Sequence, residues 1–167
     1  MDHYQAVNHI LVSLFNDIMD VEEREIISDE FKDISSNDMH IIEVIGQEEP
    51  KNMSAIASKM KVTVGTLTIA INNLVKKGYV VRTRGEKDRR VVFISLSEKG
   101  NRAYEYHKKF HDEMTKAILK RLDDQEIEVL MKALNNIREY FHLPTVYHDK
   151  SISVGQLEFL LDVVSLF

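Results

Sequence analysis

The sequence predicts a mostly α-helical protein that carries one small β-hairpin. Apolar residues recur at steps of three and four over long stretches of the 167 residues, as on the buried face of a helix. Only two prolines and six glycines interrupt these stretches. The alternation typical of strands is confined to two short runs, residues 79–84 and 91–97, with a polar turn between them.

The first predicted helix covers residues 2–27 and is followed by a second over 36–47. The first is long and amphipathic, so it needs a partner surface, either within the chain or on a second copy. Ser35 precedes the second helix, and Asp38 lies three positions on, as a capping box requires. The apolar stripe of the first helix consists of Val7, Leu11, Leu14, Ile18 and Val21.

Two shorter helices, residues 52–60 and 63–77, lead into the hairpin, and Gly78 ends the second of them. This order of two helices and a hairpin is that of a winged helix-turn-helix, which lays one helix in the major groove of DNA. The residues with core spacing in this region are Ile56, Met60, Val62, Leu67, Ile71 and Leu74.

The remaining positions of the helix over 63–77 form a face of short side chains. This face has no charged residue from Val64 to Val75, whereas a solvated helix face would carry more Lys and Glu. Amides can read adenine, and a Thr methyl group or Ile can touch the thymine methyl group. The residues of this helix predicted to contact DNA are Thr63, Gly65, Thr66, Thr68, Ile69, Asn72 and Asn73.

Charge is distributed unevenly along the chain. The formal net charge of −5 argues by itself against nucleic acid. Residues 1–49 hold thirteen acidic and two basic residues, a local −11, but residues 76–90 hold seven basic and two acidic ones, a local +5. A basic stripe at a helix end and hairpin tip favours a DNA-contacting wing over a solvated loop. The wing residues predicted to contact DNA are Arg82, Arg84, Lys87, Asp88, Arg89 and Arg90.

Two further helices are predicted after the hairpin. Ser97 starts a long helix to about residue 122, and Asp123 with Glu126 opens a last helix to about residue 141. Together with the first helix, these can form the intertwined base of a helical dimer. A symmetric dimer presents its two recognition helices about one DNA turn (~34 Å) apart, which predicts a palindromic site. The predicted parts are an N-terminal dimerisation helix and loop (1–34), a winged helix-turn-helix domain (35–97), C-terminal dimerisation helices (98–143) and a tail of unassigned role (144–167).

Composition excludes several classes of function. The chain has no cysteine, which removes disulfides, thiolate metal sites and thiol nucleophiles. No segment reaches the ~18 consecutive apolar residues of a membrane span, and the first residues lack a secretory signal pattern, so we expect a cytoplasmic protein without a membrane partner. There is no glycine-rich phosphate loop or recognisable catalytic triad, so we expect neither an enzyme nor a cofactor. A dimeric interaction module with an unused wing is a further alternative, but it leaves the short polar helix face unexplained.

This order of elements resembles the MarR family of bacterial transcription regulators over about residues 4–143. The most specific part is the wing, where Asp88-Arg89-Arg90 followed by Val91-Val92 is similar to the family's D-x-R signature. The resemblance implies that Asp88 braces the wing by pairing with arginine and that Arg90 reaches into the minor groove, where narrow A·T-rich DNA attracts guanidinium. The alternative is a surface ion pair of little energetic worth.

Within this family, the chain most resembles the repressors of fatty-acid biosynthesis in low-GC Gram-positive bacteria. The resemblance implies a dimeric repressor that binds a palindromic operator in double-stranded DNA, with long-chain acyl-acyl carrier protein as co-repressor. The similar blocks are residues 31–35, 39–40, 44–46, 62–68, 72–74, 77–79, 88–92 and 107–111.

Three histidines are candidates for a ligand site. His107 and His111 are one turn apart on one predicted helix, and His40 lies on another. With the glutamates at the end of the first helix, these three could bind zinc, which would make the protein a zinc- or small-molecule-responsive regulator. The resemblance to the fatty-acid repressors implies instead an acyl-chain pocket without metal, between the first, second and fifth helices. The predicted ligand-binding residues are His40, His107, His111, Phe110 and Met114.

Overall fold

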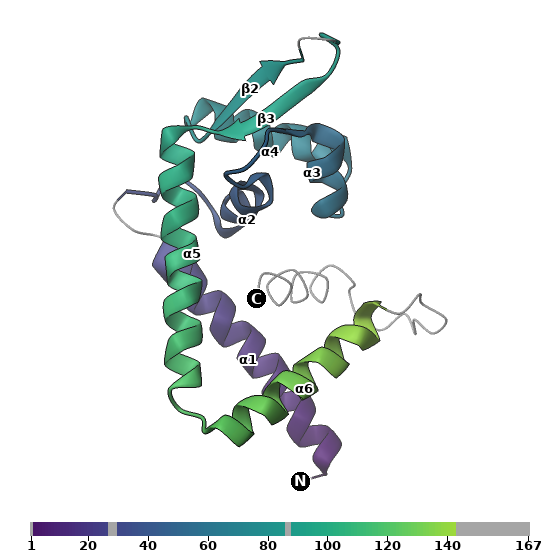
Figure 1. Cartoon of the computed structure of the whole chain (residues 1–167), viewed down its shortest axis with the longest axis vertical. Coiled ribbons are helices and arrows are strands. Elements are labelled where there is room, and N and C mark those ends of the chain that lie inside the picture. The colour runs from purple at the N-terminus through teal and green to yellow at the C-terminus, as the bar shows by residue number, and fades with distance from the viewer. Residues whose placement is uncertain (1, 27–29, 86–87, 143–167) are drawn as a thin grey trace. The chain divides into compact units, whose positions relative to one another are not determined.

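The computed structural model describes residues 2–26, 30–85 and 88–142 (Figure 1). Its elements in chain order are α1 (His3–Ile26), α2 (Ser36–Ile45), β1 (Lys51–Asn52), α3 (Met53–Lys59), α4 (Val64–Lys76), β2 (Val80–Arg84), β3 (Val92–Leu96), α5 (Glu98–Leu119) and α6 (Asp124–His142). The chain divides into two compact units, Met1–Glu113 and Met114–Phe167. The second unit contains residues 114–119 of α5 and all of α6, and the tail 144–167 lies outside the described residues.

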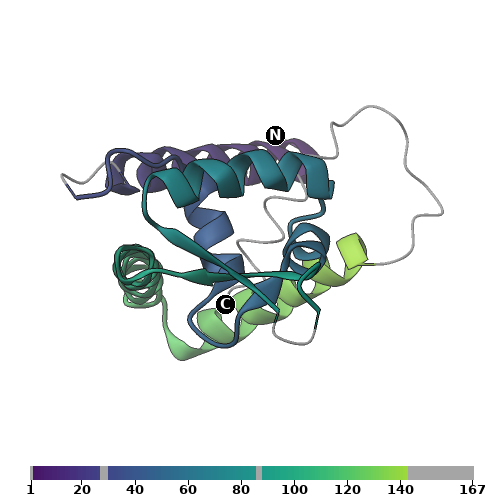
Figure 2. The same ribbon diagram turned by 90° about the horizontal axis from the view of Figure 1, so that it is seen from above.

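The prediction of a mostly helical chain with one hairpin is confirmed, but the sheet has three strands where two were predicted. Its order is β1-β3-β2, and both pairings are antiparallel. The additional strand consists of Lys51 and Asn52, which pair with Ile94 and Phe93. Two residues are too few to show alternation, so no sequence pattern marks this strand. Figure 2 looks nearly along α5, which continues from the end of β3.

The core of the first unit joins α2, α3 and α4 to the sheet. Ile42, Ile56, Ile71 and Ile94 have no exposed surface, and Tyr79 and Ala103 extend the core toward α5. The core spacing predicted for α3 and α4 is correct except at Val62, which is 40% exposed. Val62 lies in the tight turn between the two helices, where its backbone N–H donates to the Ala57 carbonyl and its side chain points outward.

Local capping signals set the helix ends. Ser35 and Asp38 form both bonds of the predicted capping box on α2, and Asp123 and Glu126 do the same on α6. Helix α2 ends at Ile45, two residues before its predicted end, because Gly46 adopts a φ of 66°. Gly78, with a φ of 79°, ends α4 as predicted, since a positive φ suits glycine.

The start of α5 is fixed to the junction of α4 and β2. The Ser97 backbone N–H donates to the Tyr79 carbonyl at 2.9 Å, and the Ser97 hydroxyl donates to the Gly78 carbonyl at 2.6 Å. Gly100 lies against the same peptide, where an added Cβ would be 2.1 Å from the Tyr79 carbonyl oxygen. The absence of a side chain at Gly100 therefore lets α5 approach the base of the hairpin.

Large apolar side chains lie exposed on both long terminal helices. On α1 they include Val7, Leu11 and Leu14, and on α6 they include Val129, Leu134 and Ile137. Each helix is amphipathic, so these side chains form apolar faces on their respective units. Among the described residues, no helix is long and apolar enough to cross a membrane.

We expect Gly100→Ala to lower the free energy of unfolding by about 1–3 kcal/mol, because the new methyl group would collide with backbone and not with a movable side chain. Urea denaturation followed by circular dichroism measures this. Gly65→Ala is the matched control, since a Cβ there would meet only the Thr63 Oγ1 at 3.6 Å. Equal stability of Gly100→Ala and the wild type would contradict the close approach of α5 to Tyr79.

Candidate DNA interface and buried histidine cluster

Helix α4 is positioned by its buried face and by its N-cap. Leu67, Ile71 and Leu74 are buried, which turns the opposite face of α4 outward. Thr63 caps the helix, its Oγ1 accepting the Thr66 N–H at 3.1 Å. Of the residues predicted to contact DNA, Thr68 is half-buried, and the others on this helix are exposed: Thr63, Gly65, Thr66, Ile69, Asn72 and Asn73.

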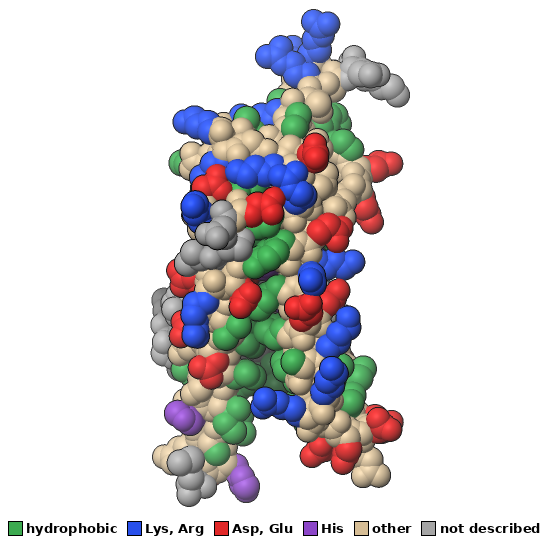
Figure 3. Space-filling model, turned by 90° about the vertical axis from the view of Figure 1, so that its left-hand side faces the viewer, with side chains coloured by type: hydrophobic (Ala, Val, Ile, Leu, Met, Phe, Trp, Pro, Cys, Tyr) green, Lys and Arg blue, Asp and Glu red, His purple; other side chains and the backbone are tan. Residues whose placement is uncertain are grey.

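The hairpin of β2 and β3 forms a wing with a cationic end. Arg82, Arg84, Arg89 and Arg90 are all exposed, and none of them forms an ion pair within the described part of the chain. Figure 3 shows Lys and Arg side chains gathered at the tip of this hairpin. The predicted contact residue Lys87 lies outside the described residues.

The role of Asp88 differs from the one that the family resemblance implies. Its Oδ1 accepts the backbone N–H of Arg90 at 2.9 Å, and no arginine side chain within the described residues forms an ion pair with it. Asp88 therefore braces the turn through the backbone, as aspartate commonly does in turns. The guanidinium of Arg90 is left exposed at the tip of the wing.

Two lysines near the wing have structural partners. Lys77 donates to Asp38 at 2.9 Å, which joins the end of α4 to the start of α2. Lys99 donates to Asp33 at 3.1 Å, and its ammonium lies 4.0 Å from the centre of the Tyr79 ring. Lys77 of the basic stripe and Lys99 of α5 therefore stabilise the fold, whereas the exposed arginines of the wing carry charge that is available to a partner.

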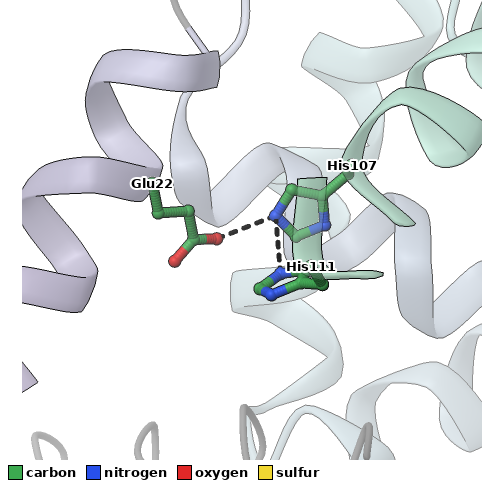
Figure 4. Close-up of side chains that lie close together, drawn as sticks. All are labelled: Glu22, His107 and His111. Carbon is green, nitrogen blue, oxygen red and sulfur yellow. Dashed lines mark hydrogen bonds and ion pairs between the residues drawn. The ribbon is translucent and has the colours of Figure 1, made fainter. Parts of the chain in front are cut away.

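A cluster of histidines and glutamates lies buried where α1, α2 and α5 meet. His107 on α5 is at its centre: its Nε2 is 2.8 Å from Oε1 of Glu22, and its Nδ1 is 2.7 Å from Oε1 of Glu43. The Nε2 of His111 lies 3.2 Å from the Nε2 of His107. His40 faces the same two carboxylates, at 3.3 Å from Glu22 and 3.5 Å from Glu43. Figure 4 shows Glu22, His107 and His111 converging.

The charges in this cluster follow from its geometry. Burial alone would lower the pKa of His107, but its hydrogen bonds to Glu22 and Glu43 outweigh this and raise the pKa to about 9. Burial opposes ionisation of Glu43, yet hydrogen bonds from His107 and His40 lower its pKa to about 2. Burial and the positive charge of His107 lower the pKa of His111. At neutral pH the cluster therefore contains a buried imidazolium held between carboxylates.

The structure brings together most of the residues predicted for a ligand site. His40, His107 and His111 share the cluster, and the Phe110 ring lies 6.4 Å from that of His107 and 5.2 Å from that of His111. Met114, half-buried on α5, belongs to the second unit, and its role stays a prediction.

The sequence interpretation missed Glu43. It follows His40 by three positions on one helix, which puts both on the same face, so this spacing could have revealed it.

Comparisons with known proteins agree with this architecture. Residues 34–92 match the profile of the MarR family. One similar solved structure is the crystal structure of Streptococcus pneumoniae FabT in complex with DNA. The two sequences are 40% identical, the alignment covers 83% of this chain and 96% of the FabT chain, and the TM-score of the superposition is 0.79.

Relatives known by sequence include two HTH-type transcriptional regulators of Bacillus subtilis (strain 168). YpoP is 26% identical over 109 residues, which are 64% of this chain and 75% of YpoP. PchR is 28% identical over 102 residues, which are 59% of this chain and 60% of PchR. MarR proteins are DNA-binding regulators and not enzymes. The match to the family profile, the identity with FabT and the shared winged helix-turn-helix fold show that this chain belongs to the MarR family of DNA-binding transcriptional regulators.

Proposed function

We propose that this protein represses fatty-acid-biosynthesis genes. The observation that carries the proposal is the 40% identity over 96% of the FabT chain, which extends well beyond the winged helix-turn-helix. The sequence blocks that resemble fatty-acid repressors support it, because they include residues 107–111 on α5 as well as residues of the DNA-binding lobe. Such a regulator acts in the cytoplasm, where its DNA is.

The DNA-binding mode that we propose uses both α4 and the wing. The uncharged outer face of α4 enters the major groove, and Arg90 at the wing tip enters the adjacent minor groove. The winged domain is assigned to residues 35–97, and residues 1–34 and 98–143 to dimerisation. The exposed apolar faces of α1 and α6 support a homodimer, because faces of this kind mark protein interfaces. A two-fold dimer matches a palindromic operator.

The co-repressor that we propose is long-chain acyl-acyl carrier protein, sensed through the histidine cluster. His107 links α5 to Glu22 on α1 and to Glu43 on α2, and α2 packs directly on the DNA-binding core. A ligand that moves α1 or α5 therefore acts on α2 through buried charges. A ligand changes DNA affinity only by favouring one arrangement of the helices, and typical couplings of ~1–3 kcal/mol correspond to roughly 5- to 150-fold.

A second candidate is a zinc-responsive regulator. One donor atom each from Glu22, His107 and His111 lies within 4.8 Å of the others, and the Nε2 of His40 is 3.3 Å from the same Glu22 oxygen. Zinc favours such a set of imidazoles and a carboxylate, and Glu43 on the Nδ1 of His107 would orient that ligand. Zinc would have to displace the proton that the two carboxylates hold on His107, so its binding would weaken as pH falls.

To test the wing, we compare Arg90→Ala with the wild type by fluorescence anisotropy over a range of salt concentrations. Loss of Arg90 should weaken operator binding and reduce the slope of log affinity against log salt by roughly 0.9 per phosphate charge left unneutralised. Arg121→Ala, which removes an exposed arginine far from the wing in sequence, is the matched control and should bind as the wild type does. An unchanged affinity and slope for Arg90→Ala would exclude Arg90 from the DNA interface.

We expect His107→Gln to destabilise the protein by roughly 3–5 kcal/mol near pH 6, because two buried carboxylates lose their counter-charge. Folding raises the pKa of His107 from 6.5 to about 9, so its stabilisation is complete below pH 6.5 and is lost as pH rises through 9. Folding lowers the pKa of Glu43 from 4.5 to about 2, so the contribution of Glu43 to stability is fully present above pH 4.5 and is lost as pH falls through 2.

Urea denaturation of the wild type and of His107→Gln from pH 5 to pH 9.5 measures this difference. The difference in free energy of unfolding between the wild type and His107→Gln should become smaller above pH 6.5. His9→Gln, which changes an exposed histidine on α1, controls for histidine loss and should track the wild type. A gap that is constant across this range would show that His107 is not charged in the folded protein.

The co-repressor is tested on a palindromic duplex from a fatty-acid-gene promoter. Long-chain acyl-acyl carrier protein should tighten binding roughly 5- to 150-fold, whereas carrier protein without the acyl chain, zinc and a chelator should have no effect. Light scattering should give two chains for each duplex. If affinity follows zinc and ignores the acyl protein, the zinc-responsive candidate replaces the acyl co-repressor.

A further inference from the structure

We infer that Ile69 selects thymine in each half of the operator by packing its side chain on the thymine 5-methyl group in the major groove. The inference rests on the proposed use of α4 for DNA binding. It does not depend on which ligand controls the protein.

Ile69 lies at the centre of the outward face of α4. It is two positions from both Leu67 and Ile71, which are 1% and 0% exposed, so on a helix its side chain points to the opposite side. Ile69 itself is 67% exposed, more than Val62, Val64 or Val81, the other exposed large apolar residues of the winged region. In a winged helix-turn-helix, this is the face that meets the base edges.

The threonines around Ile69 direct their hydroxyl groups to their own helix. The Oγ1 of Thr63 accepts the Thr66 N–H and lies 2.9 Å from the Thr66 Oγ1, and the Thr68 hydroxyl donates to the Val64 carbonyl at 2.7 Å. These bonds use part of the hydrogen-bonding capacity of hydroxyl groups that could otherwise read bases. Ile69, Asn72 and Asn73 are exposed side chains near the middle of α4 that form no such bond within the described structure, and the same holds for Val64 and Lys76 at its two ends.

Gly65, one turn before Ile69, gives an independent indication of close approach. A Cβ at this position would meet only the Thr63 Oγ1, at an ordinary contact distance of 3.6 Å, and the backbone is helical there. Neither packing nor backbone conformation therefore requires glycine, although glycine destabilises a helix by about 0.5–1 kcal/mol relative to alanine. A surface from outside the chain, lying against the backbone beside Ile69, accounts for the missing side chain.

The chemistry of the base edges identifies what Ile69 recognises. In the major groove, thymine alone among the four unmodified bases presents a methyl group, and an aliphatic side chain can distinguish it by apolar contact. The neighbouring amides of Asn72 and Asn73 suit the N6 and N7 atoms of adenine. The outward face of α4 therefore matches an A·T-rich step in which the position of the thymine is set by Ile69.

The test begins with the duplex that the wild-type protein selects from a random-sequence pool. Each symmetric pair of thymines is replaced by deoxyuridine, which removes only the 5-methyl group, and affinity is measured by fluorescence anisotropy. At one pair, binding should weaken by roughly fourfold for each methyl group lost. Ile69→Ala should bind the thymine duplex more weakly than the wild type does. Its affinity should not fall further when deoxyuridine replaces thymine at that pair, so the protein substitution and the base substitution are coupled in a double-mutant cycle.

Two variants separate this inference from simpler explanations. Asn72→Ala, on the same face, should weaken binding but keep the full sensitivity to deoxyuridine. Gly65→Ala should be at least as stable as the wild type yet bind the selected duplex at least tenfold more weakly. If the protein selects a duplex but no thymine methyl group couples to Ile69, the inference is wrong and DNA binding stands. If no sequence is selected at all, the proposed operator binding fails and the inference fails with it.

Discussion

The imidazolium of His107, buried between Glu22 and Glu43, is the interaction on which the arrangement of three helices depends. The two contacts span 85 and 64 residues of sequence, so they join α1 and α2 to α5 across most of the first unit. A buried charge is costly unless it is paired, and here each of the three groups compensates the others. Displacing one helix would leave a charge without its partner, which is why we propose that a ligand acts at this junction.

Charge serves a different purpose in the winged region. Lys77 and Lys99 are used inside the fold, where they connect α4 and α5 to Asp38 and Asp33. The arginines of β2 and the wing tip are exposed and leave the guanidinium groups available to phosphate or to a minor groove. An acidic protein can thus bind DNA because the hairpin carries four exposed arginines that form no ion pair within the described residues.

Helix α4 uses only part of its surface to hold its place in the fold. Three buried aliphatic residues and the Thr63 cap fix its position, Ala70 and Val75 pack at the edge of the core, and the outward face is left exposed. Packing does not require the exposed isoleucine or the glycine one turn before it, which agrees with the contact to DNA that we propose for this face. In the function that we propose, the histidine cluster couples a ligand to the DNA-binding core and the outward face of α4 reads the DNA, so the two tasks lie in separate parts of one unit.

The sequence by itself determined the helices, their caps and the wing, because these depend on periodicity and on residues within four positions of each other. Ser35 with Asp38, Asp123 with Glu126 and Gly78 are examples, and so is the outward face of α4. Only the tertiary structure decided that β1 joins the sheet, that Val62 is exposed and that Asp88 accepts the backbone N–H of Arg90. It also decided the ionisation of the histidine cluster, since a pKa depends on which charges meet after folding and on their burial, and the sequence alone specifies neither.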